Sequence, residues 1–381
     1  MTLQKLKKLH FINRLDYNNV GDWNCSPLSY YYDYFKQFNI IRHDIDFINY
    51  NEIEREDVVI FGGSGLFDVT ESFNNAINQV LNLCDTVIGW SCGFNTHNER
   101  WFQGSEFPKI DFSKFKLLGI RDYNHPSGIE YLPCPSSLAF DIFQGHSFKI
   151  KRKFGFIGHK DLLGDNFSFE DALTNNENIN RIAEYILSSE AIVTNSYHCA
   201  YWTLLLGRKA IVLNKFSTKF DFYKYRPEFV EIDKDESSAS INNKFHEAYE
   251  RANVYLNLFD EAKELNNKFF EKVKKIIEGA KVERNKDYEN LYKLNCEQAW
   301  NRQIGISKVE EKIFELHKDI YANLDGLRKS NESLRNELNY LQEQMDRIYR
   351  HSIYGSLEKL WFKFKSKIQQ MRDLFSKKKN K

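Results

Sequence analysis

The feature that most constrains the fold is a series of short apolar runs between residues 6 and 235, separated by longer helical or irregular stretches. Several runs are apolar throughout, which is typical of parallel strands that are covered on both faces. The predicted strands are Leu6–Ile12, Val58–Phe61, Thr86–Gly89, Leu117–Ile120, Tyr131–Leu132, Phe154–Ile157, Ala191–Val193, Ala210–Leu213 and Phe229–Ile232. The stretches Glu71–Leu83 and Asn178–Ser188 have helical spacing. Strands that alternate with helices predict an α/β fold with doubly wound sheets.

The chain of 381 residues is long enough for two such domains and a further segment. A Pro-, Ser- and Gly-containing region at 133–145 interrupts the series of strands. We therefore expect an N-terminal Rossmann-like domain at 1–140 and a C-terminal Rossmann-like domain at 141–300. The second domain is expected to end in closing helices, because apolar residues from about 237 to 300 recur at helical spacing. Such helices could cross back and pack on the first domain.

Residues 301–350 have a different pattern, in which apolar side chains recur every three or four positions. Asn331 takes the seam position between Leu327 and Leu334, where a polar residue can fix register and oligomer state. This pattern predicts a coiled coil and a homo-oligomer. The alternative is one long helix that folds back on the globular body.

The last segment, 351–381, carries eight lysines and one arginine against two acidic residues, whereas the whole chain has a formal net charge of +1. One helical face of this segment gathers apolar and aromatic residues: Leu357, Leu360, Trp361, Phe364, Ile368, Met371 and Phe375. A basic amphipathic helix of this kind predicts binding to an anionic membrane surface. The alternative is a helix that caps the coiled coil with a solvated basic face. The balanced charge of the whole chain argues against a nucleic-acid partner.

Cysteine usage and the N-terminus indicate the compartment. The six cysteines include no C-x-x-C pair and no histidine cluster at zinc spacing, so neither a disulfide framework nor a structural zinc site is expected. No signal-peptide pattern and no run of 18 apolar residues is present. We expect a cytoplasmic protein that is peripheral on the inner face of the cytoplasmic membrane.

Unusual residues follow one predicted strand after another. In open α/β sheets, ligands bind beyond the carboxyl ends of the strands, so these residues predict a cleft. The segments are 19–22, 62–65, 89–93, 121–122, 134–136, 158–160, 194–198 and 217–219.

Two of these segments suggest roles for backbone and carboxylate groups. Asp22 could act as a general base or bind sugar hydroxyls, or it could serve as a helix cap or Asx turn. The glycines of Gly62-Gly63-Ser64-Gly65 would let backbone N–H groups approach a ligand, or they could simply form a tight turn.

Other segments offer a histidine and several cations. His198, near the start of an apolar helix, could donate to phosphate oxygens or transfer a proton, or it could be a buried histidine bonded to backbone. A cleft with several cations would suit a phosphorylated donor, although any single cation is more often a surface ion-pair partner. The candidates are Arg121, His159, Lys160, Lys215 and Lys219.

Asp44-Ile45-Asp46 matches a short D-x-D metal motif, but a three-residue pattern recurs too often by chance to define a site. We keep it out of the predicted site and expect no metal.

At these residues the sequence resembles the polysaccharide pyruvyltransferase family. The similar motifs occur in the same order: Asn19-Val20-Gly21-Asp22, then Gly62-Gly63-Ser64-Gly65, Arg121-Asp122, the block Thr194–Cys199, Gly207–Ile211 and Lys219. The resemblance covers residues 7–235 and does not extend to the coiled coil or the tail.

The resemblance implies a GT-B-like pair of Rossmann-type domains and a transferase of cell-surface polysaccharide biosynthesis, such as that of capsule, O-antigen or exopolysaccharide. Members transfer pyruvyl from phosphoenolpyruvate to two hydroxyls of a sugar, forming a ketal, and need no cofactor. His198 would be the proton donor or a phosphate ligand, and Asp22 would orient or deprotonate the acceptor hydroxyl with Asn19 beside it. The implied donor-binding residues are Gly63, Ser64, Gly65, Arg121, His159, Ser196 and Lys219.

Three departures leave the donor open. Many members carry arginine where this chain has Ser196, the glycine after the histidine is Cys199, and Ser64 interrupts the glycine run. Losing a bidentate anion ligand is not conservative, and a fold alone does not fix chemistry. The alternatives are a GT-B glycosyltransferase that transfers from a nucleotide sugar, such as a CMP-linked acidic sugar, to a lipid-linked glycan, and a non-catalytic scaffold.

Overall fold

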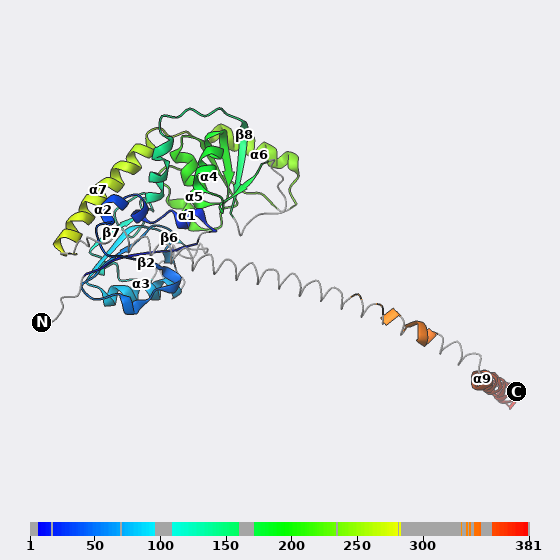
Figure 1. The fold of residues 1–381 in the computed structure, drawn as a ribbon. Helices are drawn as coiled ribbons and strands as arrows, with labels where there is room; N and C mark the ends of the chain where they lie inside the picture. Colours follow the sequence, from blue (N-terminus) through cyan, green and yellow to red (C-terminus); the bar gives the residue numbers. More distant parts are fainter. Residues whose placement is uncertain are drawn as a thin grey trace. The chain divides into compact units, whose positions relative to one another are not determined.

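Parallel β-sheets organise the part of the chain that comes before the C-terminal extension (Figure 1). The structure is a computed structural model. It describes residues 7–16, 18–68, 71–95, 109–159, 171–233, 235–280, 282, 329, 333, 335–336, 339–343 and 353–379. The chain divides into two units, Met1–Asn295 and Cys296–Lys381.

The first sheet has five parallel strands in the order β2-β1-β3-β5-β7. Their bounds are β1 Leu9–Asn13, β2 Ile40–Asp44, β3 Val58–Phe61, β5 Thr86–Cys92 and β7 Leu117–Ile120. All five residues of β1 and all four of β3 are buried, because neighbouring strands and helices cover both faces. Three of the five residues of β1 and all four of β3 are apolar. On one face α3, Glu71–Leu83, packs through Ile77 and Val80.

The second sheet also has five parallel strands, in the order β12-β11-β10-β8-β9. Their bounds are β8 Arg152–Gly158, β9 Leu173–Thr174, β10 Ser189–Thr194, β11 Lys209–Leu213 and β12 Glu228–Val230. When the strands of each sheet are ranked along the chain, both sheets have the same order, 2-1-3-4-5. The predicted α/β class is confirmed.

The remaining elements of the first unit connect and cover these sheets. The helices are α1 Val20–Trp23, α2 Tyr32–Phe35, α4 Ile179–Leu187, α5 Tyr197–Leu205, α6 Ser238–Arg251 and α7 Leu258–Gly279. Short 3-10 turns are η1 Pro27–Ser29, η2 Ile45–Phe47, η3 Tyr50–Glu52, η5 Phe112–Lys114, η6 Pro135–Phe143 and η7 Thr218–Phe222. A small parallel pair consists of β4 Phe67–Asp68 and β6 Phe94–Asn95.

Helix α7 follows the second sheet in sequence but contacts the first, beside α2 and β7 (Figure 1). Phe269 and Val273 of α7 are buried against the apolar residues of β1 and β3. Asn266 accepts a 2.8 Å bond from the indole of Trp90 in β5 and donates to the carbonyl of Pro133 at 3.0 Å. This helix therefore joins the two halves of the first unit.

The structure corrects several predicted elements. Tyr131–Leu132 is not a strand, because Tyr131 makes only an isolated bridge with Ile120. Strands β2 and β9 were not predicted, since β2 carries Arg42 and His43 within an apolar run and β9 has only two residues. Predicted strands 58–61 and 117–120 and the helix 71–83 have the observed bounds.

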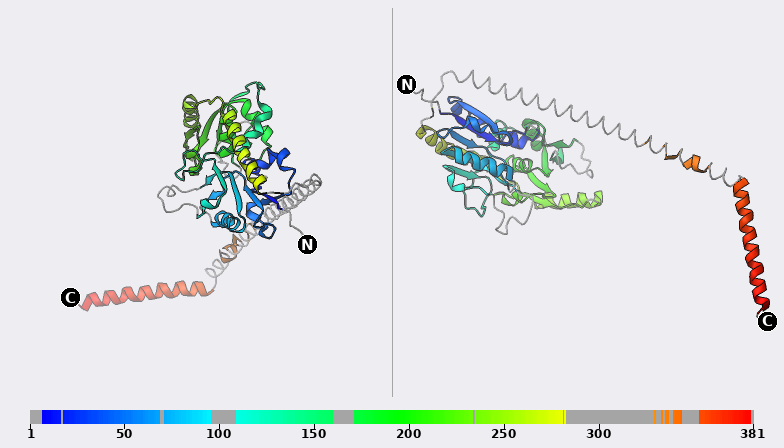
Figure 2. Two further views of the ribbon diagram at one scale, coloured as in Figure 1. Left: turned by 90° about the vertical axis from the view of Figure 1, so that its left-hand side faces the viewer. Right: turned by 90° about the horizontal axis from the view of Figure 1, so that it is seen from below.

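The second unit is described mainly by α9, Ile353–Lys379, a helix of 27 residues (Figure 2). Leu357, Leu360 and Trp361 of its predicted apolar face are more than half exposed. Apart from a few single residues, the coiled coil predicted at 301–350 lies outside the described residues. Within the described part, no helix combines the length and apolarity needed to cross a bilayer.

Candidate functional site

A cavity of about 600 Å³ gathers nearly all of the predicted site residues. The residues that line it include Asn19, Asp22, Ser64, Gly65, Arg121, His159, Ser196, His198 and Lys219. Gly63 does not line it: its N–H donates to the Cys25 carbonyl at 3.0 Å, behind the cavity wall. Residues from both halves of the first unit therefore form one site.

Each of these predicted lining residues comes shortly after the carboxyl end of a strand. Asn19 and Asp22 follow β1, Ser64 follows β3, and Arg121 follows β7 directly. In the second sheet, His159 follows β8, His198 follows β10 and Lys219 follows β11. This is the edge at which open parallel sheets bind ligands.

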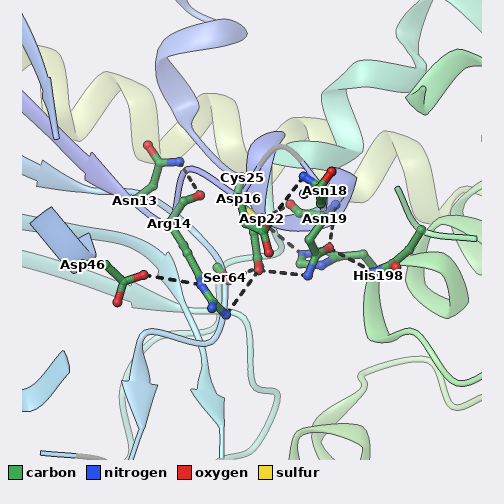
Figure 3. Close-up of polar contacts among 12 residues, drawn as sticks. Asn13, Arg14, Asp16, Asn18, Asn19, Asp22, Cys25, Asp46, Ser64 and His198 are labelled. Atoms are coloured by element: carbon green, nitrogen blue, oxygen red, sulfur yellow. Dashed lines mark hydrogen bonds and ion pairs between the residues drawn. The ribbon is translucent and has the colours of Figure 1, made fainter. Parts of the chain in front are cut away.

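Asn19 caps the short helix α1 and so leaves Asp22 available to the cavity. The Asn19 side chain accepts from the Gly21 N–H at 3.2 Å, and its amide donates to Asp22 at 3.0 Å. Asp22 also accepts from the Ser64 hydroxyl and lies 3.9 Å from the Arg14 guanidinium (Figure 3). Asn19, and not Asp22, therefore caps this helix, so the helix-cap role considered for Asp22 does not apply.

Ser64 has a left-handed backbone conformation, with φ of 84°. Residues other than glycine rarely adopt this conformation because the Cβ is crowded. The same turn brings the Ser64 hydroxyl to the Asp22 carboxylate. Glycine would be less strained at this position, but it could not make this bond.

His198 lies in the first turn of α5 and is nearly buried. Its Nε2 contacts the Cys25 thiol at 3.2 Å and the Arg121 guanidinium at 3.4 Å. A guanidinium has only donors, so Nε2 accepts, and a neutral imidazole then carries its proton on Nδ1. The Nε2 contacts of this histidine are thus with side chains and not with the backbone, as the alternative had it.

The Arg121 side chain lines the cavity and packs against Gly93 and the ring of Tyr197. A Cβ on Gly93 would lie 2.1 Å from Arg121 Nε, so only glycine allows the guanidinium to pass. The guanidinium carbon lies 4.2 Å from the ring centre of Tyr197, and Nε has no hydrogen-bond partner. Such a buried cation with unused donors can bind an anionic ligand group.

Asp122, next to Arg121, is fully buried and is not among the residues that line the cavity. It accepts from the Phe94 N–H at 2.9 Å and thereby anchors β6. Burial raises the pKa of Asp122 to about 7, although the charge of Arg121 opposes this rise.

The other predicted cations have different surroundings. The Lys219 ammonium lies 4.8 Å from the ring centre of Phe216, at the cavity wall. Lys215 instead pairs with Asp221 at 2.8 Å, as expected for a surface ion pair. The backbone N–H of His159 donates to the side-chain oxygen of Asn195 at 2.6 Å. Lys160 lies outside the described residues.

Several residues of the cavity wall were not predicted. Asp46, which belongs to the D-x-D pattern that we kept out of the predicted site, follows the unpredicted strand β2 and lies 3.6 Å from Arg14, so its exclusion was wrong. Asn175 follows the unpredicted strand β9. Both line the cavity, as do Arg14, Ser72, Phe73, Asn95 and Phe216. Tyr197, which belongs to the predicted segment 194–198, lines it as well. Recognising the two strands would have revealed Asp46 and Asn175, because the strand-end rule applies to them equally.

No protein-family model matches the chain, and no curated protein matches it. Among solved structures, the chain is similar to a functionally uncharacterized protein from Klebsiella pneumoniae subsp. pneumoniae. The two are 14% identical, with a TM-score of 0.39, and the match covers 60% of this chain and 93% of that chain.

Proposed function

We propose that the protein is a transferase of bacterial-type cell-surface polysaccharide biosynthesis, which transfers pyruvyl from phosphoenolpyruvate to a glycan sugar. The two halves of the first unit would be Rossmann-like domains in a GT-B-like pair. The observation that carries this proposal is the single cavity at the strand ends of both sheets, with Arg121 and Lys219 on its wall. It agrees with the motif order that resembles the polysaccharide pyruvyltransferase family.

The donor would bind through its anionic groups. Phosphoenolpyruvate carries a carboxylate and a phosphate, and Arg121 and Lys219 offer two permanent cations. Arg14 is a third cation in the wall, but Asp22 and Asp46 lie within 4 Å of its guanidinium and offset its charge. We therefore assign the donor to the side of the cavity formed by Arg121 and Lys219.

The acceptor hydroxyls would lie at Asp22. Ketal formation joins two sugar oxygens to C2 of the donor, releases phosphate, and moves one hydroxyl proton to C3 while the other leaves with phosphate. Asp22, positioned by Ser64 and Asn19, would take the hydroxyl proton. His198, whose Nδ1 carries the proton of the neutral ring, would supply the proton to C3 and regain one from Asp22, so that the ring is neutral before and after the step.

A second candidate is transfer from a nucleotide sugar, and Ser196 favours it. Ser196 is buried in the cavity wall where many members of the resembled family have arginine. Without that guanidinium, the donor pocket has one fewer ligand for phosphate and carboxylate groups.

The two candidates are separated by ligand-induced thermal stabilisation. We expect phosphoenolpyruvate to raise the melting temperature of the full chain and CMP-, UDP- and GDP-linked sugars to leave it unchanged. Stabilisation by a nucleotide sugar alone would refute pyruvyl transfer, and no response to any donor would favour the non-catalytic scaffold. His198→Ala should abolish transfer while retaining the fold by circular dichroism.

We also propose that α9 attaches the protein to an anionic membrane at the cytoplasmic face, after a coiled coil that makes the chain a homo-oligomer. Exposed Trp361 and Leu360 would enter the interface, and the exposed Lys359, Lys363 and Lys367 would face lipid headgroups. An acceptor on a lipid-linked glycan would then lie on the same surface as the enzyme.

A further inference from the structure

Three potential metal-ligating side chains from distant parts of the sequence meet behind the cavity wall. Cys25 follows α1, Cys134 precedes η6, and His198 lies in the first turn of α5. Cys25 and Cys134 are essentially inaccessible and His198 is 6% exposed. Among the described residues, these three form the group of histidine, cysteine and acidic side chains whose ligand atoms converge closely enough to hold a metal ion.

The distances between the three ligand atoms match one face of a tetrahedron. The two sulfurs are 3.5 Å apart, and Nε2 of His198 lies 3.2 Å from Cys25 Sγ and 3.8 Å from Cys134 Sγ. Tetrahedral zinc with Zn–S of about 2.3 Å and Zn–N of about 2.0 Å needs separations of roughly 3.8 Å for S···S and 3.5 Å for S···N. Shifts of a few tenths of an ångström would therefore seat the ion.

We propose that Cys25, Cys134 and His198 form a zinc site with two thiolates, one imidazole and an open fourth position. Two thiolates neutralise the ion, so the nearby Arg121 guanidinium faces no net positive charge. Thiolate and imidazole ligands favour zinc over magnesium or calcium. The spacing of these residues along the chain does not reveal the site, because the three ligands come from three separate segments.

The contacts within the cluster affect the acidity of both thiols. Burial alone would raise the pKa of Cys134, but its contacts with Cys25 and His198 lower that pKa well below its usual range. The pKa of Cys25 is raised by burial and by its neighbour Cys134. Zinc binding would release the protons that the two thiols carry.

The zinc site goes beyond the proposed function and does not depend on it. Zinc would take Nε2 of His198, whereas the proton proposed for transfer is on Nδ1. The ion would also cross-link α1 and α5, which contribute to the cavity wall, with the segment before η6.

The test uses the full chain with its cysteines reduced, together with three variants that each replace one buried cysteine by serine. Metal content is measured by mass spectrometry, and the metal-free chain is titrated with Co²⁺ as a spectroscopic probe. Cys25→Ser and Cys134→Ser each remove one proposed ligand. Cys84→Ser is the matched control, because Cys84 is also buried but donates to the Asp57 carbonyl, outside the cluster.

We expect one equivalent of zinc per chain and a thiolate-to-cobalt charge-transfer band that Cys84→Ser retains. Cys25→Ser and Cys134→Ser should weaken cobalt binding by more than about 100-fold, since even outer-shell partners contribute 10- to 100-fold. If the reduced wild-type chain binds neither zinc nor cobalt, the proposal is wrong. This result does not depend on whether the variants fold. A band that persists in the Cys25→Ser/Cys134→Ser double variant, or a Cys25–Cys134 disulfide in place of bound metal, also overturns it. Phosphoenolpyruvate stabilisation of the metal-free chain tests the proposed function separately.

Discussion

The imidazole of His198 occupies the space that a side chain on Gly21 would need. A Cβ at Gly21 would lie 2.2 Å from Nδ1 of His198 and 2.6 Å from its Cγ. These atoms belong to residues 177 positions apart, in the two halves of the first unit. The glycine of the N-x-G-D motif is therefore required by a tertiary contact with the proposed catalytic histidine.

Gly21→Ala should displace His198 or the turn that carries Asp22. Overpacking of this kind costs on the order of 1–3 kcal/mol, and we expect loss of donor-induced stabilisation in the folded variant. Chemical denaturation and thermal shift with phosphoenolpyruvate measure the two effects. Gly279→Ala is the control, because no atom lies within 4 Å of its added Cβ. Equal donor binding by Gly21→Ala would contradict the contact.

Arg121→Lys should weaken phosphoenolpyruvate binding by roughly tenfold or more. Hydrogen bonds to charged groups contribute about 1.5–3 kcal/mol, and a lysine cannot reproduce the planar guanidinium over Gly93 and Tyr197. Isothermal titration calorimetry measures the change. Arg55→Lys, at an exposed pair with Asp85, should bind like the wild type. Wild-type affinity in Arg121→Lys would remove Arg121 from the donor site.

Ser64→Gly and Ser64→Ala separate backbone strain from the bond to Asp22. Both remove the hydroxyl, but only glycine relieves the left-handed conformation, which costs about 1–2 kcal/mol. We expect the melting temperature of Ser64→Gly to be higher than that of Ser64→Ala, by roughly 2–4 °C for each kcal/mol of strain that glycine relieves. We expect both variants to transfer pyruvyl more slowly than the wild type. An alanine variant as stable as the glycine variant would refute the strain. A full transfer rate in both would show that the bond to Asp22 is dispensable.

Acidification should destabilise the protein through His43. Its Nε2 lies 2.9 Å from His10, which contacts Asp57 at 3.0 Å. Burial, with the nearby charges of His10 and Lys8, lowers the pKa of His43 to about 4. Because the unfolded chain binds this proton with a pKa of about 6.5, the stabilisation is complete above that pH and is lost as pH falls from 6.5 to 4.

The matched measurement compares the unfolding free energies of the wild type and His43→Gln by denaturant titration at each pH. The difference should change by on the order of 1–3 kcal/mol across this window. Asp122, whose raised pKa gives the opposite slope, is present in both chains and cancels in the difference. A pH-independent difference would contradict the lowered pKa.

Leu360→Ser/Trp361→Ser should weaken binding to vesicles with anionic lipid, because these exposed side chains would supply the apolar contact. Deletion of residues 352–381 should abolish it. Phe47→Ser is a matched control, since Phe47 is 81% exposed but lies in the first unit. Co-sedimentation with anionic and neutral vesicles measures the effect. Equal binding by the deletion variant would refute attachment through α9.

The sequence by itself determined the α/β class, most of the strands and most of the residues of the cavity wall. Parallel strands buried on both faces need continuous apolar runs, and the residues that follow them lie at the ligand-binding edge of each sheet. For this reason Asp22, Arg121 and His198 could be found without coordinates. Strands β2 and β9 were missed because one carries polar residues and the other is short. Asn175 was therefore missed, and Asp46 was wrongly kept out of the predicted site.

Only the tertiary structure decided which side chains meet. The contact of His198 with Gly21, the path of Arg121 over Gly93 and the convergence of Cys25, Cys134 and His198 join segments that are far apart in sequence. Local patterns record how each segment folds, whereas such contacts depend on how two sheets pack against each other. The same separation hides the proposed zinc ligands, because a metal site formed by three segments leaves no fixed spacing along the chain.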